Sequence, residues 1–490
     1  MKSWVVFFIL LFISSIFYFE RTVAQTCENW TEPQALTSDD TDNRNATLVR
    51  LWDGPWSYYL FWQRSNDSGL SEIVFMNYYQ QGAPQTIVYG DGFTVSNPEV
   101  IVGGYWAGPD TLGYLFYETN QNGNGDIYYW VWTYDGFSNP VPFANTGNEE
   151  SNLSTSNGGG IVWQENDKVN YSRLEWTSSG AQFSSMIMVD SGQCFNPVIH
   201  HVGQDIQEEF LAWEKGDPEN PEIWYCKWDW QNEIWGEPVL LFSDGSHTNI
   251  RFSRSFYDSR YPLLLSDFKD EDGNYGISAY DFSSQDAFSS EFRQQGPFHP
   301  DYFAVDPHEK DFWNYGYLCF EAEITPEDFD IYSSDHGFLE PYLNAYCCVD
   351  RSTTNEVNPQ FFEALEGGDC FNLDCIWESY RNGYWQLYSC YTLIISGGID
   401  EKDLNQRIDA VAKPNPFFEE TKVSYSLETT TKITVSIYNA NGQFIRQSSP
   451  VLQNAGFHEV TINMLGFSTG IYLIKVDSEN GFGMTRVIKN

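Results

Sequence analysis

Basic residues are scarce in this sequence. Its 490 residues include 26 Lys and Arg against 68 Asp and Glu, which gives a formal net charge of −42. Nucleic-acid backbones and anionic membrane surfaces repel so acidic a chain, so we expect no nucleic-acid partner. Cations, neutral sugars and basic proteins stay open as ligands.

Long apolar runs are also absent, apart from residues 5–19. This run follows Lys2 and precedes small residues that lead to Ala24. That order is typical of a secretory signal peptide, and the run is shorter than the roughly 20 residues that a membrane-spanning helix needs. We therefore predict a signal peptide at residues 1–24, no transmembrane segment and export of the mature chain.

Motifs of common hydrolases are missing as well. The sequence has no Gly-x-Ser-x-Gly elbow and no His-Glu-x-x-His motif, so nothing supports a serine hydrolase or a zinc protease. Histidine is scarce, with seven in the chain. A catalytic role would therefore use carboxylates or one of these few histidines.

Aromatic residues, in contrast, make up 17% of the chain, which favours β structure. A short strand that ends in an acid or amide, usually after an aromatic residue, recurs seven times at intervals of 46 to 57 residues. The acids and amides are Gln63, Glu118, Gln164, Glu214, Asp267, Glu321 and Glu378. Each copy follows a turn, at Asn45, Asn97, Asn152, Asn196, Asn249, His299 and Asn358.

About four short strands in a repeat of this length are typical of a propeller blade. We therefore predict an all-β fold, a seven-bladed β-propeller at residues 25–400 followed by a small Ig-like β-sandwich. The stretch from Trp30 resembles the one from Trp235, so an N-terminal strand is expected to complete the seventh blade. Six or eight blades, or another repetitive β fold, are the alternatives. Residues 323–337 break the pattern and are expected to form a loop.

Cysteine numbers nine, an odd count, and export permits disulfides. The predicted closure places Cys27 beside the last blade. We therefore expect Cys27 to pair with Cys390 or with Cys375.

The charge changes near residue 408. Residues 408–490 carry seven Lys and Arg and seven Asp and Glu, so the whole negative charge belongs to the preceding segment. Alternating strands joined by Asn-Gly turns predict six or seven strands here, in the size of a small Ig-like sandwich. We expect a linker at residues 401–412 and a separate domain at residues 413–490.

Ordered motifs fill this last domain: "KPNPF" at 413–417, "VSIYNANGQFI" at 435–445, "GIYLIKV" at 470–476 and a terminal "RVIKN". They closely resemble the type A C-terminal sorting domain of the type IX secretion system of Bacteroidetes. The resemblance implies two partners, the translocon that recognises the domain and the sortase that removes it. It also implies a secreted protein or one at the outer face of the outer membrane. An adhesive surface module is the alternative.

In a propeller, the repeated acids and amides would lie near one rim of the central channel. They would either hydrogen-bond to the backbone of their own or a neighbouring blade, or face the channel and bind a cation or sugar hydroxyls. The candidate catalytic residues are Glu118, Glu214, Asp267, Glu321 and His299. The candidate binding residues are Trp62, Gln63, Trp163, Gln164, Trp213 and Glu378.

Two loops rich in Asn, Asp and Gly have the oxygen spacing that can wrap calcium, the one cofactor that the sequence suggests. Neither has the downstream Glu of an EF-hand, and ordinary Asx turns explain both equally well. The candidate metal ligands are Asn120, Asn122, Asn124, Asp126, Asp270 and Asp272.

Three functions remain open. The favoured hypothesis is an exported propeller that binds a polysaccharide or a surface protein. The second is an extracellular polysaccharide lyase or glycoside hydrolase that uses the rim acids, and the third is a purely structural surface component. The sequence alone does not decide whether the chain is an enzyme.

Overall fold

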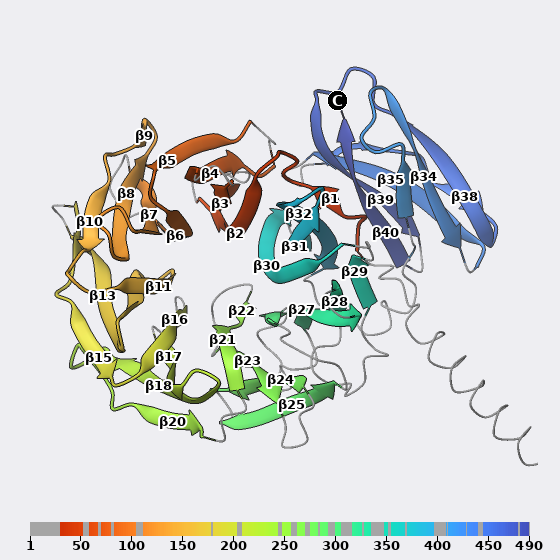
Figure 1. The fold of residues 1–490 in the computed structure, drawn as a ribbon. Coiled ribbons are helices and arrows are strands. Elements are labelled where there is room, and N and C mark those ends of the chain that lie inside the picture. Colours follow the sequence, from red (N-terminus) through yellow and green to blue (C-terminus); the bar gives the residue numbers. More distant parts are fainter. Residues whose placement is uncertain are drawn as a thin grey trace, which may run out of the picture. The chain divides into compact units, whose positions relative to one another are not determined.

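The computed structural model contains strands and, among the residues that it describes, no helix (Figure 1). The all-β prediction is therefore confirmed. The structure describes residues 30–51, 58–66, 70–79, 83–103, 111–177, 180–202, 208–243, 247–255, 262–269, 275–282, 285–292, 299–304, 316–325, 328–334, 347–350, 354–367, 370–395, 408, 410–427, 429–439, 444–478 and 481–489. The predicted signal peptide lies outside these residues. No helix in the described part is long and apolar enough to cross a membrane.

The chain divides into two compact units. The first comprises Met1–Glu363 and Leu373–Thr392, and the second comprises Ala364–Asn372 and Leu393–Asn490. Each is described by itself below.

The described strands before residue 396 form seven sheets, which we number in chain order. Sheet 1 contains β2 (Asp42–Arg50), β3 (Tyr58–Ser65), β4 (Leu70–Asn77) and β5 (Gln85–Asp91). Sheet 2 contains β6 (Val95–Val102), β7 (Thr111–Thr119), β8 (Asp126–Thr133), β9 (Gly136–Phe137) and β10 (Val141–Ala144). Sheet 3 contains β11 (Glu150–Thr155), β12 (Gly160–Glu165), β13 (Lys168–Thr177), β14 (Gly180–Phe183) and β15 (Ile187–Ser191). Sheet 4 contains β16 (Cys194–Val202), β17 (Glu208–Asp217), β18 (Asn220–Asp229), β19 (Ile234–Trp235) and β20 (Val239–Phe242).

The three remaining sheets follow the same antiparallel plan, with one short parallel pair. Sheet 5 contains β21 (His247–Phe252), β23 (Leu263–Lys269), β24 (Tyr275–Asp281) and β25 (Asp286–Phe292). Sheet 6 contains β22 (Arg254–Ser255), β26 (Asp301–Ala304), β27 (Gly316–Thr325), β28 (Asp328–Ser334) and β29 (Cys347–Asp350), with β22 parallel to β26. Sheet 7 contains β30 (Glu356–Gly367), β31 (Cys370–Arg381), β32 (Tyr384–Ile395) and β1 (Gln34–Ala35).

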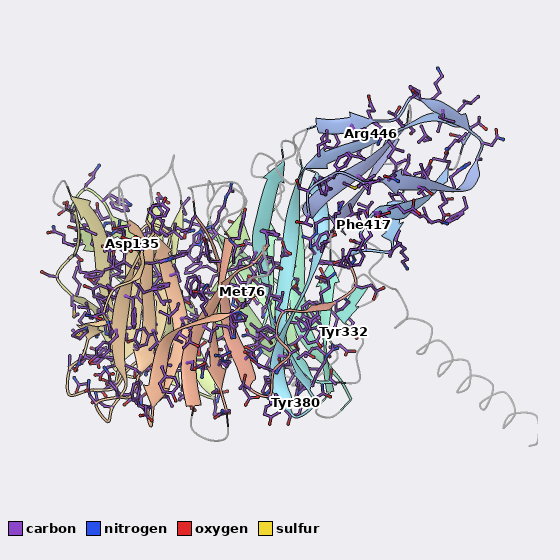
Figure 2. The ribbon with its side chains drawn as sticks, turned by 90° about the horizontal axis from the view of Figure 1, so that it is seen from above. Met76, Asp135, Tyr332, Tyr380, Phe417 and Arg446 are labelled. Carbon is purple, nitrogen blue, oxygen red and sulfur yellow. The ribbon has the colours of Figure 1, made fainter. Side chains whose placement is uncertain are left out.

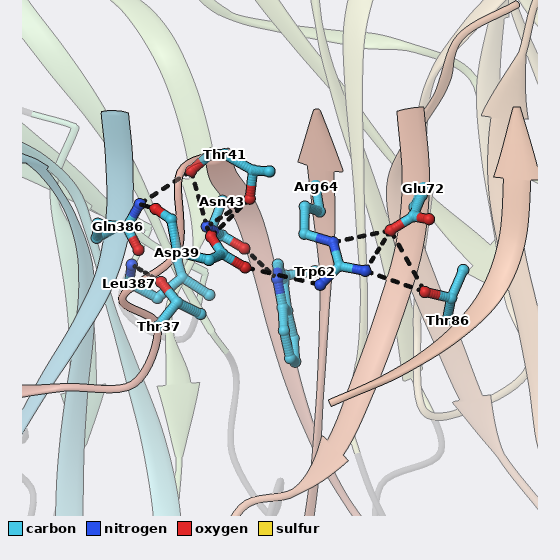
Figure 3. Close-up of polar contacts among 10 residues, drawn as sticks. All are labelled: Thr37, Asp39, Thr41, Asn43, Trp62, Arg64, Glu72, Thr86, Gln386 and Leu387. Carbon is cyan, nitrogen blue, oxygen red and sulfur yellow. Dashed lines mark hydrogen bonds and ion pairs between the residues drawn. The ribbon is translucent and has the colours of Figure 1, made fainter. Parts of the chain in front are cut away.

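Sheet 7 is built from both ends of this region. Gln34 pairs with Ser389 and Trp30 forms a bridge with Thr392, so the N-terminal segment covers the edge of β32. Hydrogen bonds beyond the strand extend the junction, including Leu387 N to Thr37 Oγ1 at 2.9 Å (Figure 3). The edge of β32 is therefore paired instead of open to association with another chain.

Apolar side chains on the sheet faces form the core between consecutive sheets. Phe61 of β3 packs with Trp132 of β8, and Phe143 of β10 packs with Trp163 of β12, each pair in an edge-to-face geometry. Alternating residues of a strand point to opposite faces, so each sheet contributes one set of side chains to each neighbour. These aromatic side chains are thus packed between neighbouring sheets, and Figure 2 shows the side chains along the strands.

One sequence prediction about this region is wrong. Residues 323–337 were expected to form a loop, but Glu323 pairs with Phe329 in the hairpin of β27 and β28. The hairpin buries Ile331 fully, and burial of this apolar side chain stabilises the strand. The many acidic residues of the stretch made it look like a loop.

The described part of residues 408–489, which make up most of the second unit, contains eight strands in two sheets. They are β33 (Ala410–Lys413), β34 (Glu420–Leu427), β35 (Thr431–Asn439), β36 (Phe444–Gln447), β37 (Val451–Gln453), β38 (Gly456–Asn463), β39 (Gly470–Ser478) and β40 (Gly481–Lys489). One sheet joins β33, β34 and β38, and the other joins the remaining five. Val423 and Ile474, both fully buried, lie in the single core that the two sheets share. The expected linker at 401–412 lies partly outside the described residues, and its last residues belong to β33.

Candidate functional site

The turn residues predicted from the repeats lie inside the first long strand of their sheets or, for His299, just before it. All seven have a positive φ, between 39° and 56°. In sheets 1 to 5, the register of this strand shifts across the turn residue, which marks a β-bulge. Asn suits this position because its short polar side chain tolerates the left-handed region and can bond nearby.

Each turn residue also contacts the repeated acid or amide of its own sheet. Asn97 Nδ2 donates to Glu118 Oε1 at 2.9 Å, and His299 Nδ1 lies 2.7 Å from Glu321 Oε1. The same contact joins Asn45 to Gln63, Asn152 to Gln164, Asn196 to Glu214, Asn249 to Asp267 and Asn358 to Glu378.

The five acids also accept a hydrogen bond from the backbone of the next sheet. The N–H of Leu153 in sheet 3 donates to Glu118 Oε1 at 2.9 Å, and the N–H of Asn358 in sheet 7 donates to Glu321 Oε2 at 2.5 Å. We call each such pair of contacts an inter-sheet link. The other three join Glu214 to Ile250 at 3.4 Å, Asp267 to His299 at 3.1 Å and Glu378 to Asn45 at 2.9 Å.

The last of these links returns from sheet 7 to sheet 1. Glu378 accepts the N–H of Asn45 through Oε1 and forms an ion pair with Arg44 through Oε2 at 2.7 Å. Asp374 of β31 accepts the hydroxyl of Tyr78 as well. Sheets 1 and 7 are therefore joined by side chains as well as by β1.

Burial changes the acid–base behaviour of the links. Glu214 is 2% exposed, and burial raises its pKa to about 7 against the hydrogen bonds from Ile250 and Asn196. Burial raises the pKa of Glu118 as well. Burial lowers the pKa of His299, but its hydrogen bond to Glu321 and the charge of that carboxylate outweigh burial and raise it overall. A carboxyl with a raised pKa could serve as a general acid, but these groups are already engaged.

The structure thus distributes the five candidate catalytic residues over four sheets and gives each of them a partner. Glu214, Asp267 and Glu321 are at most 3% exposed, while Glu118 and His299 are partly exposed. The four acids accept hydrogen bonds from the backbone of the neighbouring sheet, which is one of the two arrangements expected from the sequence.

The three candidate binding tryptophans are core residues, which corrects the expectation that they would face a ligand. Trp62 and Trp213 are fully buried and Trp163 is 2% exposed. The indole N–H of Trp62 donates to Asn43 Oδ1 at 2.8 Å, within the buried network of Figure 3. Adjacent residues of a strand point to opposite faces, so an aromatic residue and the acid after it do not face one ligand together.

The other candidate binding residues differ in exposure. Glu378 is 2% exposed, but Gln63 and Gln164 are half-buried. Gln164 accepts Asn152 Nδ2 through its oxygen and donates Nε2 to Asn166 O at 2.6 Å. Within the described residues, neither glutamine bonds to the next sheet.

The loop predicted to bind calcium at 120–126 is described, whereas Asp270 and Asp272 lie outside the described residues. Asn120 Oδ1 accepts the N–H of Thr94, and Asn122 Nδ2 donates to Asp126 Oδ2 at 2.7 Å. Asn124 Nδ2 donates to Asn148 O. Among the described residues, no three His, Cys, Asp or Glu side chains stand close enough together to hold a metal ion.

The predicted disulfide partner Cys27 also lies outside the described residues. Cys390 of β32 and Cys375 of β31 are both buried. The thiol of Cys375 lies close to the thiols of Cys390 and of Cys319 of β27.

Sequence reasoning missed a buried acid between sheets 3 and 4, where the repeated residue is the amide Gln164. Glu209 is fully buried and accepts Ser156 Oγ at 2.8 Å, Tyr171 Oη at 3.0 Å and the guanidinium of Arg173. Arg173 also stacks on Trp230, 4.2 Å from its ring centre. Glu209 is not part of the repeated motif, and its partners are 36 to 53 residues away in sequence, so the pattern gives no signal for it.

Comparison with known proteins identifies the last domain. A model of the secretion system C-terminal sorting domain matches residues 413–490. No curated protein sequence matches the chain.

Three of the solved structures that the chain is similar to are the following. The β-propeller domain of the trilobed protease from Pyrococcus furiosus is 8% identical, with a TM-score of 0.40, over 69% of this chain and 96% of that one. A puromycin-hydrolysing peptidase from Mycobacterium tuberculosis is 10% identical, with a TM-score of 0.37, over 82% of this chain and 61% of that one. The NanB sialidase from Streptococcus pneumoniae is 7% identical, with a TM-score of 0.39, over 74% of this chain and 71% of that one.

The sorting domain that the ordered motifs predicted is therefore confirmed. Residues 413–490 are a secretion system C-terminal sorting domain, and its presence indicates that the chain is exported to the cell surface or secreted.

Proposed function

We propose that this chain is an exported, seven-bladed β-propeller that binds a polysaccharide or a surface protein without chemically changing it. The observation that carries the proposal is the use of the rim acids. All five accept hydrogen bonds from the backbone of the next sheet, so their carboxylate oxygens are used to hold neighbouring sheets together. A glycosidase or lyase needs at least one such group free to act on the substrate.

Several features support seven blades at residues 25–400. Each of the seven sheets has at least four strands. In every sheet, the repeated acid or amide lies on the strand that pairs with the strand at or just after the turn residue. The link from Glu378 to Asn45 joins the last sheet to the first. The two sheets around one core in the second unit support an Ig-like sandwich for residues 413–490.

The ligand would bind at the end of the sheets opposite the links. Tyr134 follows β8 and Trp230 follows β18, so the two residues occupy equivalent places after the third strand of sheets 2 and 4. Both are exposed, at 61% and 38%. Tyr134 precedes Asp135, which Figure 2 labels at the opposite end of the sheets from Tyr380. Exposed aromatic faces stack well on sugar rings and on protein side chains. Tyr134 is the better platform of the two, because Arg173 already stacks on Trp230.

The experiment uses the mature chain and a panel of polysaccharides with neutral and uronate backbones. Retention of the protein on one polysaccharide, with no new reducing ends and no unsaturated uronate products, would support binding. Product formation would show an enzyme and contradict the proposal, and retention on none of them would leave only a surface protein as the ligand.

A matched pair of variants locates the binding face. Tyr134→Ala should weaken retention about tenfold, because one aromatic platform contributes roughly 1.4 kcal/mol. Tyr89→Ala is the control, because Tyr89 is equally exposed, at 57%, but lies on the outermost strand β5. Equal loss in both variants would contradict the assignment of the face.

We also propose that the type IX translocon and a sortase are the partners of residues 413–490. Deletion of these residues should retain the protein in the periplasm. The full chain should reach the cell surface or the medium and lose the domain on the way. Surface delivery of the truncated chain would contradict this route.

A further inference from the structure

Two carboxylate oxygens between sheets 2 and 3 have no hydrogen-bond partner among the described residues. They are Asp126 Oδ1, at the start of β8, and Glu150 Oε2, at the start of β11. Asp126 is fully buried and Glu150 is 1% exposed. A buried carboxylate oxygen without a donor is costly, because the group loses its water and gains nothing in return.

The two acids come from segments that are packed together. The N–H of Glu150 donates to the carbonyl of Gly125 at 2.9 Å, and the N–H of Gly125 donates to Glu149 Oε2 at 3.0 Å. Asn124 Nδ2 donates to the carbonyl of Asn148. The loop before β8 and the segment before β11 therefore form one polar cluster.

In each of the two acids, one carboxylate oxygen accepts a hydrogen bond within the cluster and the other has no partner among the described residues. Asp126 Oδ2 accepts Asn122 Nδ2 at 2.7 Å, and Glu150 Oε1 accepts Thr146 Oγ1. Asn122 Nδ2 also donates to the Tyr128 hydroxyl at 3.1 Å, although Asn122 itself is exposed. Two buried carboxylate oxygens from one cluster are thus available to a cation.

The cluster also brings acidic side chains of two sheets together. Like charges that lie close together in a buried site repel each other, unless a proton or a cation neutralises them. No Lys or Arg of the described residues forms an ion pair with Asp126 or Glu150.

We propose that calcium binds here, with Asp126 Oδ1 and Glu150 Oε2 among its ligands. Both ligand atoms are carboxylate oxygens, which suit a hard cation and disfavour zinc. The cluster lacks a third carboxylate, imidazole or thiol at metal-binding distance. Calcium tolerates this, because backbone carbonyls and water complete its six to eight ligands in irregular geometry, whereas magnesium requires a near-ideal octahedron.

The ion would join two sheets. Asp126 belongs to sheet 2 and Glu150 to sheet 3, the same pair that Glu118 links through the N–H of Leu153. Calcium would therefore reinforce that link. The sequence showed the loop at 120–126 but not Glu150, which is 24 positions beyond Asp126 and in the next sheet.

The test is calcium titration by calorimetry of the mature full-length chain after removal of divalent ions. The wild-type chain should bind calcium, and Asp126→Asn and Glu150→Gln should each bind at least about tenfold more weakly, because each removes one ligand charge. Asp135→Asn is the matched control. It removes one exposed acid at the other end of β8 and should bind as the wild type does.

A second measurement needs no variant. Hydrogen exchange of the wild-type chain should slow in peptides that cover residues 120–128 and 145–151 when calcium is added, and magnesium should have a smaller effect. Absence of calcium binding by the wild-type chain, or unchanged exchange in these peptides, would overturn the proposal. Equal affinity of the wild type and both ligand variants would overturn it as well.

Discussion

The interface between sheets 2 and 3 and the interface between sheets 3 and 4 follow one plan but differ at one residue. Glu118 accepts Asn97 Nδ2 and the N–H of Leu153, whereas Gln164 accepts only Asn152 Nδ2 and donates its own Nε2 to Asn166 O. A carboxylate offers acceptors alone, while an amide offers one acceptor and two donors. The acid is thus suited to a place where several N–H groups converge.

The backbone of the next sheet explains why the residues differ. In sheet 3, which faces Glu118, the residue after Asn152 is Leu153, and it has an N–H. In sheet 4, which faces Gln164, the residue after Asn196 is Pro197, and it has none. In sheet 2, which faces Gln63, the residue at the same place is Pro98. Proline is not the whole cause. His299 and Asn358 also precede prolines, yet each donates its own N–H to Asp267 or Glu321. At the Gln164 interface, Glu209 and Arg173 supply the missing connection.

The largest effect is expected from Glu209→Ala at the interface of sheets 3 and 4. The change leaves the guanidinium of Arg173 in a buried site without its carboxylate, which costs about 3–5 kcal/mol of the free energy of unfolding. Chemical denaturation of the mature chain measures this. Glu459→Ala is the control, because it breaks an exposed ion pair with Lys422 and should leave the midpoint of unfolding unchanged. Equal stability of Glu209→Ala and the wild type would contradict the account.

The next effect concerns pH at the link between sheets 4 and 5. The folded state holds the pKa of Glu214 near 7, above its ordinary value of 4.5, so the folded chain binds the proton more tightly than the unfolded chain. This contribution is fully present below pH 4.5 and is lost as the pH rises through about 7, a change on the order of 3 kcal/mol.

Glu214→Gln should remove most of that dependence when unfolding is measured from pH 4.5 to pH 8. Glu118, Glu150 and His299 leave a residual slope of the same sign, because their pKa values are also raised in the folded state. An identical pH profile for the variant and the wild type would show that Glu214 does not carry the effect.

The positions of the turn residues and of the repeated acids could be predicted from the sequence, because a repeated local geometry requires repeated residues. The positive φ of the bulge favours Asn, and the acid on the second strand recurs with it, so self-similarity located both. Trp62 was misassigned although period-2 alternation places it opposite Gln63, and that signal was available.

The partners of the acids were beyond the sequence. Glu118 contacts Leu153, and Glu209 contacts Ser156, through a packing of sheets that the pattern of one repeat does not contain. Glu150 likewise bonds to Gly125, the residue before Asp126, only because sheet 3 packs on sheet 2. The sorting domain was recognised fully, since its motifs are local and ordered.

A smaller effect is expected from Glu118→Gln at the interface of sheets 2 and 3. The amide places donors opposite the N–H of Leu153, which then lacks part of its acceptor, and the free energy of unfolding should fall by about 1–3 kcal/mol. Urea denaturation in the presence of a chelator measures this without a contribution from calcium. Equal stability in chelator would contradict the link.

The smallest effect is expected from the reverse change, Gln164→Glu. Pro197 has no N–H that could donate to the new carboxylate, and the bond from Nε2 to Asn166 O is lost. The free energy of unfolding should therefore fall by about 1 kcal/mol. A rise in stability would mean that an acid at this position suffices by itself and that the donor of the next sheet is irrelevant.

Hydrogen exchange at the amide of Leu153 tests most directly whether the acids join the sheets. Mass spectrometry of short peptides around Leu153, in chelator, would compare the wild type with Glu118→Gln and Gln164→Glu. The account predicts exchange at least about tenfold faster in Glu118→Gln, because a lost bond of about 1.4 kcal/mol shifts local opening by that factor, and unchanged exchange in Gln164→Glu. Unchanged exchange of Leu153 in Glu118→Gln would contradict the inter-sheet link.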